Sequence, residues 1–134
     1  MKGILVMVSL LAIWPFAASK EYPMRASSSV PAASGIVKVQ SDKNNENTKV
    51  DIKVWHLANP SRLTPTANVY IVWFRTRDGA AVKQGAIRVD NNQKGEVKLV
   101  TVAKDFEVLI TAEQSESADM PSDFEVLRAD VTIR

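Results

Sequence analysis

The catalytic chemistry open to this chain is limited by its single histidine, His56, and by the absence of cysteine. A Ser-His-Asp or Cys-His arrangement needs an imidazole or another base within hydrogen-bond reach of the nucleophile. His56 ends an alternating run in the sequence Trp55-His56-Leu57, and nothing around it resembles a nucleophile elbow. We therefore expect His56 to be a partly buried residue at a strand end, bonded to the backbone. We predict no catalytic residue.

Metal ligands are equally scarce. Zinc and copper sites use several His or Cys ligands, and the soft donors that could join the one histidine, Met24 and Met120, lie far apart in the sequence. Residues 90–95 place Asp, Asn and Gly at the first, third and sixth positions of a calcium loop. Lys94 stands at the fifth position and Thr101 at the twelfth, where carboxylate ligands belong. We predict a polar hairpin turn here, no metal site and no bound cofactor.

Two acid pairs invite comparison with the carboxylates of glycosidases: Asp105 with Glu107, and Glu113 with Glu116. The spacing of two acids in a sequence does not set the distance between their carboxylates in space. We interpret both pairs as solvated surface residues.

Large aromatic residues crowd two stretches of the chain: Trp55, Tyr70, Trp73 and Phe74. The core of a small domain needs only some of these side chains. An excess that points outward would form an apolar patch, and such patches mark contact surfaces. A contact surface built from these aromatics is therefore a hypothesis for the folded protein.

Residues 1–19 have the three parts of a secretory signal peptide: Lys2 at the start, the apolar run Ile4–Ile13, and small residues after Pro15. Cleavage is predicted after Ser19. The alternative is an uncleaved anchor, but a spanning helix needs about 20 apolar residues and this run is shorter. We predict an exported protein, periplasmic or extracellular, with no stable membrane insertion after cleavage and a core that folds without disulfides.

The formal charge of +2 comes from interspersed basic and acidic residues. No basic patch of the kind that follows a phosphate backbone is present in the sequence. We predict that the protein does not bind nucleic acid.

The chain divides into the leader, a small-residue stretch at 20–34 that we interpret as a flexible tether, and a domain at 35–134. The domain alternates β-branched and aromatic runs with turn formers, and Gly85 within one run suggests a bulge or a close backbone approach. This pattern predicts an all-β domain, a two-sheet antiparallel sandwich, immunoglobulin-like or transthyretin-like, of about seven strands. The predicted strands are 36–40, 49–54, 69–74, 82–89, 97–102, 106–112 and 124–133.

One order of motifs carries a family resemblance: Val69–Phe74, then Asp78-Gly79, Gly85-Ala86, a polar turn ending at Gly95, and Phe106–Glu113. In this order the chain resembles the extracytoplasmic C-terminal domain of anti-sigma-K factors. The likeness covers about one domain, from Gly35 to Ile133. It implies a sandwich fold and a sensing or interaction role outside the cytoplasm.

The sequence also departs from that family. Gln114 stands where the family has proline, and residues 114–121 lack the double glycine. The family's cytoplasmic sigma-binding domain and spanning helix have no counterpart in this sequence, so the resemblance does not imply sigma-factor binding. It supplies no functional residues.

The sequence thus predicts a non-enzymatic module that binds an envelope protein, a surface polymer or a small ligand. The contact would use a sheet face or the two longest loops, Ala58–Ala67 and Gln114–Asp123. One alternative is a structural or stress-related periplasmic protein without a specific ligand. The other is a hydrolase, against which the single histidine and the missing cysteine count.

Overall fold

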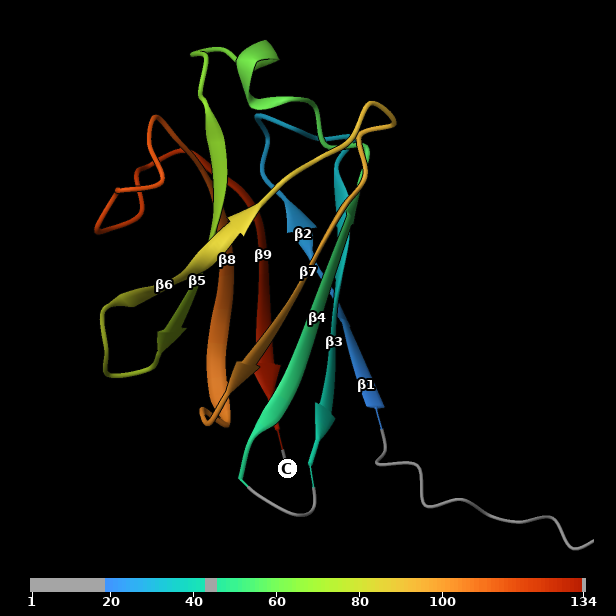
Figure 1. Ribbon diagram of the computed structural model, residues 1–134, viewed down its shortest axis with the longest axis vertical. Coiled ribbons are helices and arrows are strands. Elements are labelled where there is room, and N and C mark those ends of the chain that lie inside the picture. Colours follow the sequence, from blue (N-terminus) through green and yellow to red (C-terminus); the bar gives the residue numbers. More distant parts are fainter. Residues whose placement is uncertain (1–18, 43–45, 134) are drawn as a thin grey trace, which may run out of the picture.

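A computed structural model describes residues 19–42 and 46–133 and shows two antiparallel sheets packed face to face (Figure 1). The four-stranded sheet has the order β1-β3-β4-β7, and the five-stranded sheet has the order β2-β9-β8-β5-β6. The predicted all-β, two-sheet antiparallel sandwich is confirmed. The strands found in the described residues are β1 (Ser19–Pro23), β2 (Arg25–Ala26), β3 (Ser34–Ser41), β4 (Thr48–Trp55), β5 (Val69–Thr76), β6 (Ala81–Ile87), β7 (Gly95–Thr101), β8 (Asp105–Glu113) and β9 (Glu125–Thr132).

Several strands form where apolar and polar residues alternate, whereas β5 is apolar and buried at six consecutive positions. In β4, Val50, Ile52 and Val54 are buried between the sheets, while the intervening side chains point outward. The partner strand β3 is in register, with Val37 opposite Ile52. A slip of one residue would expose the whole apolar set, so burial fixes the register.

The prediction of a flexible tether at 20–34 is wrong, and the number of strands is nine in the described residues instead of about seven. Residues Ser19–Pro23 form β1 at the edge of the four-stranded sheet, and Arg25–Ala26 form β2 beside β9 in the other sheet. Met24 lies at the crossing between the sheets, buried in the core, and its N–H donates to the carbonyl of Gly35 over 2.8 Å. This segment is ordered because it contributes apolar surface to the core.

The predicted leader 1–19 lies, except for Ser19, outside the described residues. No helix within the described ranges has the length and apolar character needed to cross a bilayer.

The core lies between the sheets and is rich in β-branched residues. Val72 and Phe74 of β5 point into it, and the ring of Phe74 packs against that of Phe106 with centroids 4.6 Å apart. The predicted irregularity at Gly85 is confirmed: the β5–β6 register shifts there, and Gly85 has φ 153°, which side chains rarely tolerate.

The segment between β4 and β5 closes one end of the sandwich (top of Figure 1). It contains the short helix η1 (Pro60–Arg62), and three of its apolar residues, Pro60, Leu63 and Ala67, are buried. The hydroxyl of Tyr70 donates to the carbonyl of Ala58 over 2.6 Å. Burial raises the pKa of Tyr70 to about 12.

Candidate functional site

The outer face of the five-stranded sheet is covered. Its centre is an apolar cluster of Ile71, Trp73 and Leu109, and the Trp73 side chain is fully buried. Residues 114–123, which we call the strap, lie on this side of the sheet, and Ala118 of the strap packs against the cluster. A partner therefore cannot reach this apolar surface while the strap is in place.

Hydrogen bonds tie the root of the strap to the sheet. The Trp73 Nε1–H donates to Thr111 Oγ1 over 2.8 Å, and the Thr111 hydroxyl donates to Glu113 Oε2 over 2.5 Å. The same Glu113 oxygen accepts the Ser122 N–H over 2.9 Å. The buried Glu113 carboxylate thus connects the two ends of the strap.

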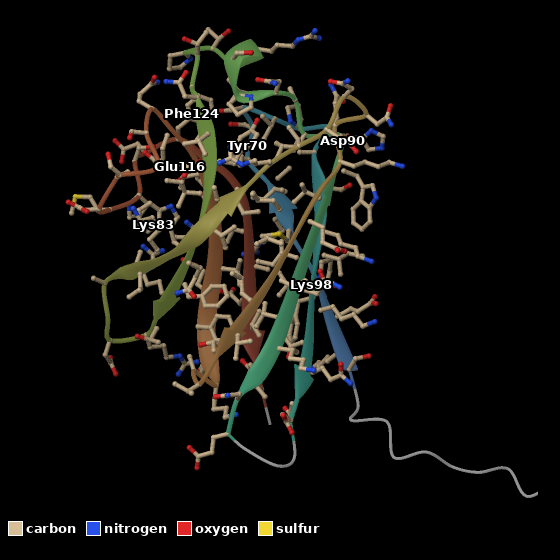
Figure 2. The ribbon with its side chains drawn as sticks, in the orientation of Figure 1. Tyr70, Lys83, Asp90, Lys98, Glu116 and Phe124 are labelled. Atoms are coloured by element: carbon tan, nitrogen blue, oxygen red, sulfur yellow. The ribbon has the colours of Figure 1, made fainter. Side chains whose placement is uncertain are left out.

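A second set of contacts holds the middle of the strap. Lys83 Nζ donates to the carbonyls of Glu116 and Ala118 over 2.6 and 2.8 Å, and Arg88 forms an ion pair with the Glu116 carboxylate. Figure 2 shows Lys83 and Glu116 close together on one side of the molecule.

The remainder of this sheet face is occupied by charged pairs. Glu107 lies between Arg75 of β5 and Arg128 of β9, and forms ion pairs with both. Arg128 Nε also donates to Glu125 over 2.5 Å, and this hydrogen bond raises the pKa of Arg128. The outer face of the five-stranded sheet is covered for the most part by its own contacts, and a pocket of about 270 Å³ lined by Ile71, Lys83, Gly85 and Glu116 remains beside the strap.

The outer face of the four-stranded sheet, which we call the open face, is different. Its side chains come from the outward positions of β3, β4 and β7, where Lys38, Asp51 and Lys98 stand directly opposite one another across three strands. Figure 2 places Lys98 on the side of the molecule away from Lys83 and Glu116. No strap covers this face within the described residues.

Two shallow grooves run over the open face. One has a volume of about 420 Å³ and includes Lys38, Lys49, Asp51, Lys98 and Val100 in its lining. The other has a volume of about 510 Å³ and lies between the end of β4 and the β6–β7 turn. Its polar and aromatic lining comprises Lys53, Trp55, Arg88, Asp90, Lys94 and Glu96.

Several polar groups in these grooves have no partner of their own. Lys38, Lys49 and Lys98 form no ion pair with any described residue. The Asp51 Oδ1 atom is buried and accepts no hydrogen bond from the described part of the chain. Two cations of the second groove are paired: Lys53 with Glu96 at 3.5 Å, and Arg88 with Glu116 of the strap. Unsatisfied polar groups of this kind favour a partner that supplies donors and negative charge.

The structure changes the interpretation of the histidine. His56 is exposed instead of partly buried, and its backbone has φ 55°, in the left-handed region. The expectation of partial burial is wrong because the chain turns sharply at the end of β4, where the next residue, Leu57, is buried and donates its N–H to the Gln93 carbonyl over 3.1 Å.

The residues considered for metals do not come together. Met24 is in the core and Met120 is 73% exposed in the strap. No group of three or more His, Cys, Asp or Glu residues that could hold a metal is present in the described part of the chain. The 90–95 segment forms a polar turn in which Asp90 Oδ1 accepts the N–H groups of Asn92 and Lys94, over 2.8 and 3.0 Å.

The acid pairs considered from the sequence are each drawn into separate contacts. Asp105 pairs with Arg77 at 3.3 Å, whereas Glu107 pairs with two other arginines. Glu113 is buried beneath the strap and is not a solvated residue, so that part of the interpretation is wrong. Sequence patterns cannot locate a strap that folds back over its own sheet.

The aromatic patch does not form as proposed. Tyr70, Trp73 and Phe74 are buried, and of the four crowded aromatics Trp55 alone keeps a partly exposed ring. Its place on the outward positions of β4 follows from the alternation that the sequence already displays. The two predicted contact loops are also engaged in the fold, one as the closure of the sandwich end and the other as the strap.

The chain matches no protein-family model, and no curated protein is significantly similar to it in sequence. The resemblance to the anti-sigma-K domain therefore stays a prediction.

Proposed function

We propose that this protein is an exported, non-enzymatic sandwich module that binds a partner in the cell envelope through the open face of its four-stranded sheet. One observation supports the proposal most strongly: the outer faces of the two sheets differ in how far the protein's own residues cover them. The strap and a network of ion pairs cover most of the five-stranded sheet and leave a pocket of about 270 Å³, whereas the four-stranded sheet presents two larger grooves that contain lysines unpaired with any described residue. Exposed grooves with convergent polar groups are the usual binding sites of small domains.

A location outside the cytoplasm is supported by the signal-peptide pattern of residues 1–19, and the cysteine-free sequence is compatible with a bacterial envelope. The sequence likeness to an anti-sigma-K extracytoplasmic domain agrees with a sensing or binding role. The partner on this proposal is an envelope protein or a surface polymer, with no nucleic acid involved.

A binding role is favoured over catalysis by how the acidic residues are used. Glu107, Glu113 and Glu116 all hold parts of the fold together. The one imidazole, of His56, has no hydrogen bond to another described residue. The three glutamates stabilise the fold, and the histidine has no hydrogen-bonded partner among the described residues to activate it. We therefore assign the contact surface to the open face.

A structural protein without a specific ligand is the second candidate. It is favoured by the engagement of both long loops, since the end closure and the strap stabilise the sandwich without creating a mobile binding loop. The two candidates differ in whether the open face is covered in the native setting.

Lysine footprinting separates them. The protein is treated with an acetylating reagent, alone and in an envelope preparation from the cells that produce it, and modification is measured at each lysine by mass spectrometry. Binding predicts protection of Lys38, Lys49 and Lys98, while Lys83 and Lys104, which lie elsewhere, react equally in both samples. Equal reactivity at all five lysines would reject the binding role in favour of the structural one.

A further inference from the structure

Resting on the proposed function, we infer that the open face binds an acidic polysaccharide, a sugar polymer that carries carboxylates at intervals along its length. The inference joins three features of this face: a partly exposed indole in a groove, an excess of positive charge, and one hydrogen-bond acceptor, Asp51 Oδ1, placed among the cations without a partner in the described chain.

Trp55 supplies the apolar contact. Its ring lines the groove between the end of β4 and the β6–β7 turn, beside the charged residues Arg88 and Lys94. An indole offers a rigid apolar surface with one polar N–H, which suits the mixed C–H and hydroxyl surface of a sugar ring. At the other end of the face, Val100 is 58% exposed and offers a second apolar contact.

The charge of the face is positive. The two grooves together contain six lysine or arginine side chains and three acids, and Glu21 of β1 stands opposite Lys38 at the edge. Because Arg88 is also paired with Glu116, the resulting charge is +1, which equals the formal charge of the chain without the predicted leader and its Lys2, so the rest of the mature chain is neutral on balance. An anionic polymer would approach this face in preference to any other.

The acids among the lysines exclude a densely charged ligand. Asp51, Asp90 and Glu96 would repel the closely spaced phosphates of a nucleic acid. Sugar hydroxyls, by contrast, donate hydrogen bonds to carboxylates. The Asp51 Oδ1 atom, buried between Lys38 and Lys98 without a partner, is an acceptor that such a hydroxyl satisfies when the flexible lysines extend toward the polymer.

The dimensions favour a polymer over a single sugar. The outward residues of β4 run from Lys49 to Trp55, a span of about 20 Å at the usual rise of a strand. Both grooves lie along this line, so several units of one chain contact the face at the same time. Multiple weak contacts along a chain produce useful affinity from shallow grooves.

Titration calorimetry with defined polymers tests the inference. The probes are polygalacturonate, neutral dextran, poly-L-glutamate and a single-stranded DNA oligonucleotide, each added to protein purified from the cells that produce it. We expect saturable binding of polygalacturonate that weakens with added salt, and affinity at least tenfold lower for each of the other three. Equal or tighter binding of poly-L-glutamate or DNA would overturn the inference, as would a lack of polygalacturonate binding.

Variants locate the contact. Trp55→Ala is expected to weaken polygalacturonate binding about tenfold, which corresponds to the value of one aromatic contact. The double variant Lys49→Gln/Lys98→Gln changes only exposed side chains, and it should weaken binding and flatten the salt dependence. The control Arg77→Gln removes an exposed charge from the β5–β6 turn and should leave affinity unchanged. If the double variant bound as tightly as the parent, the open face would not be the polysaccharide site.

The outcome is separable from that of the proposed function. Lysine protection in the envelope preparation without polygalacturonate binding would reject the acidic polysaccharide and leave a binding module for another partner. If neither lysine protection nor polygalacturonate binding were observed, the proposal of a binding module would be rejected as well.

Discussion

The buried hydroxyl of Tyr70 predicts a specific loss of stability in alkali. This hydroxyl donates to the Ala58 carbonyl and joins β5 to the segment that closes the end of the sandwich. Burial raises its pKa from the ordinary 10.0 to about 12. The perturbation is a rise in pH through that interval, with no change in sequence.

The direction of the change in stability depends on whether the folded or the unfolded chain holds the Tyr70 proton. Between pH 10 and 12 the unfolded chain releases the Tyr70 proton while the folded chain keeps it, so the free energy of unfolding falls as the pH rises. The contribution is fully present below pH 10. One pKa unit corresponds to about 1.4 kcal/mol, so roughly 1.4 kcal/mol is lost by pH 11 and up to about 2.7 kcal/mol above the folded pKa.

Urea unfolding at pH 8 and pH 11 measures this loss in the parent and in Tyr70→Phe. The variant lacks the hydroxyl and should be less stable at pH 8 by about 1 kcal/mol, the usual value of one hydrogen bond. It should also be the less sensitive of the two to alkali, by roughly 1.4 kcal/mol at pH 11. Other alkaline titrations are common to both proteins and cancel. An identical alkaline loss in the two proteins would refute the assignment.

Three further substitutions test the fold. Met24→Ala should lower the free energy of unfolding in urea by about 2–5 kcal/mol because the side chain is in the core. A loss below roughly 0.5 kcal/mol would instead support a flexible tether at residues 20–34. Glu113→Ala removes the acceptor that connects the ends of the strap, so protease cleavage within 114–123 should become faster, and unchanged cleavage would contradict that role. Gly95→Ala places a Cβ 2.6 Å from the Arg88 carbonyl oxygen, so the melting temperature of this variant should be lower than that of the parent. Equal melting temperatures would show that the close approach of the two backbone segments is not required.

The sandwich could be predicted from the sequence because burial on one face of a strand leaves a period-two pattern. Runs such as Val50, Ile52 and Val54 show this pattern and were placed within a residue or two of their observed ends. The bulge at Gly85 was also predictable, since a glycine inside a strand pattern seldom has another cause.

The first two strands were missed although a signal was present. Tyr22, Met24 and Ala26 alternate with polar residues and proline, and all three pack into or against the core. The serine-rich stretch that follows them has the composition of a flexible segment and obscures this alternation. A two-residue strand such as β2 is defined by its neighbour β9 and not by its own composition.

The candidate site could be predicted only in part. The outward residues of each strand are evident from the alternation, including Lys49, Lys53 and Trp55. Which sheet face stays open depends on the strap, whose position is set by long-range contacts such as those of Lys83 with residues more than 30 positions away. Local sequence patterns do not predict such long-range contacts.

Chemical-shift mapping gives the most direct test of the central claim that the open face is the contact surface. Isotopically labelled protein is titrated with soluble envelope extract, and backbone amide shifts are followed residue by residue. We predict that the largest changes fall in β3, β4 and β7, with the Trp55 indole N–H among them. Changes centred on Ala58–Ala67 or on the strap, or no changes at all, would contradict the account.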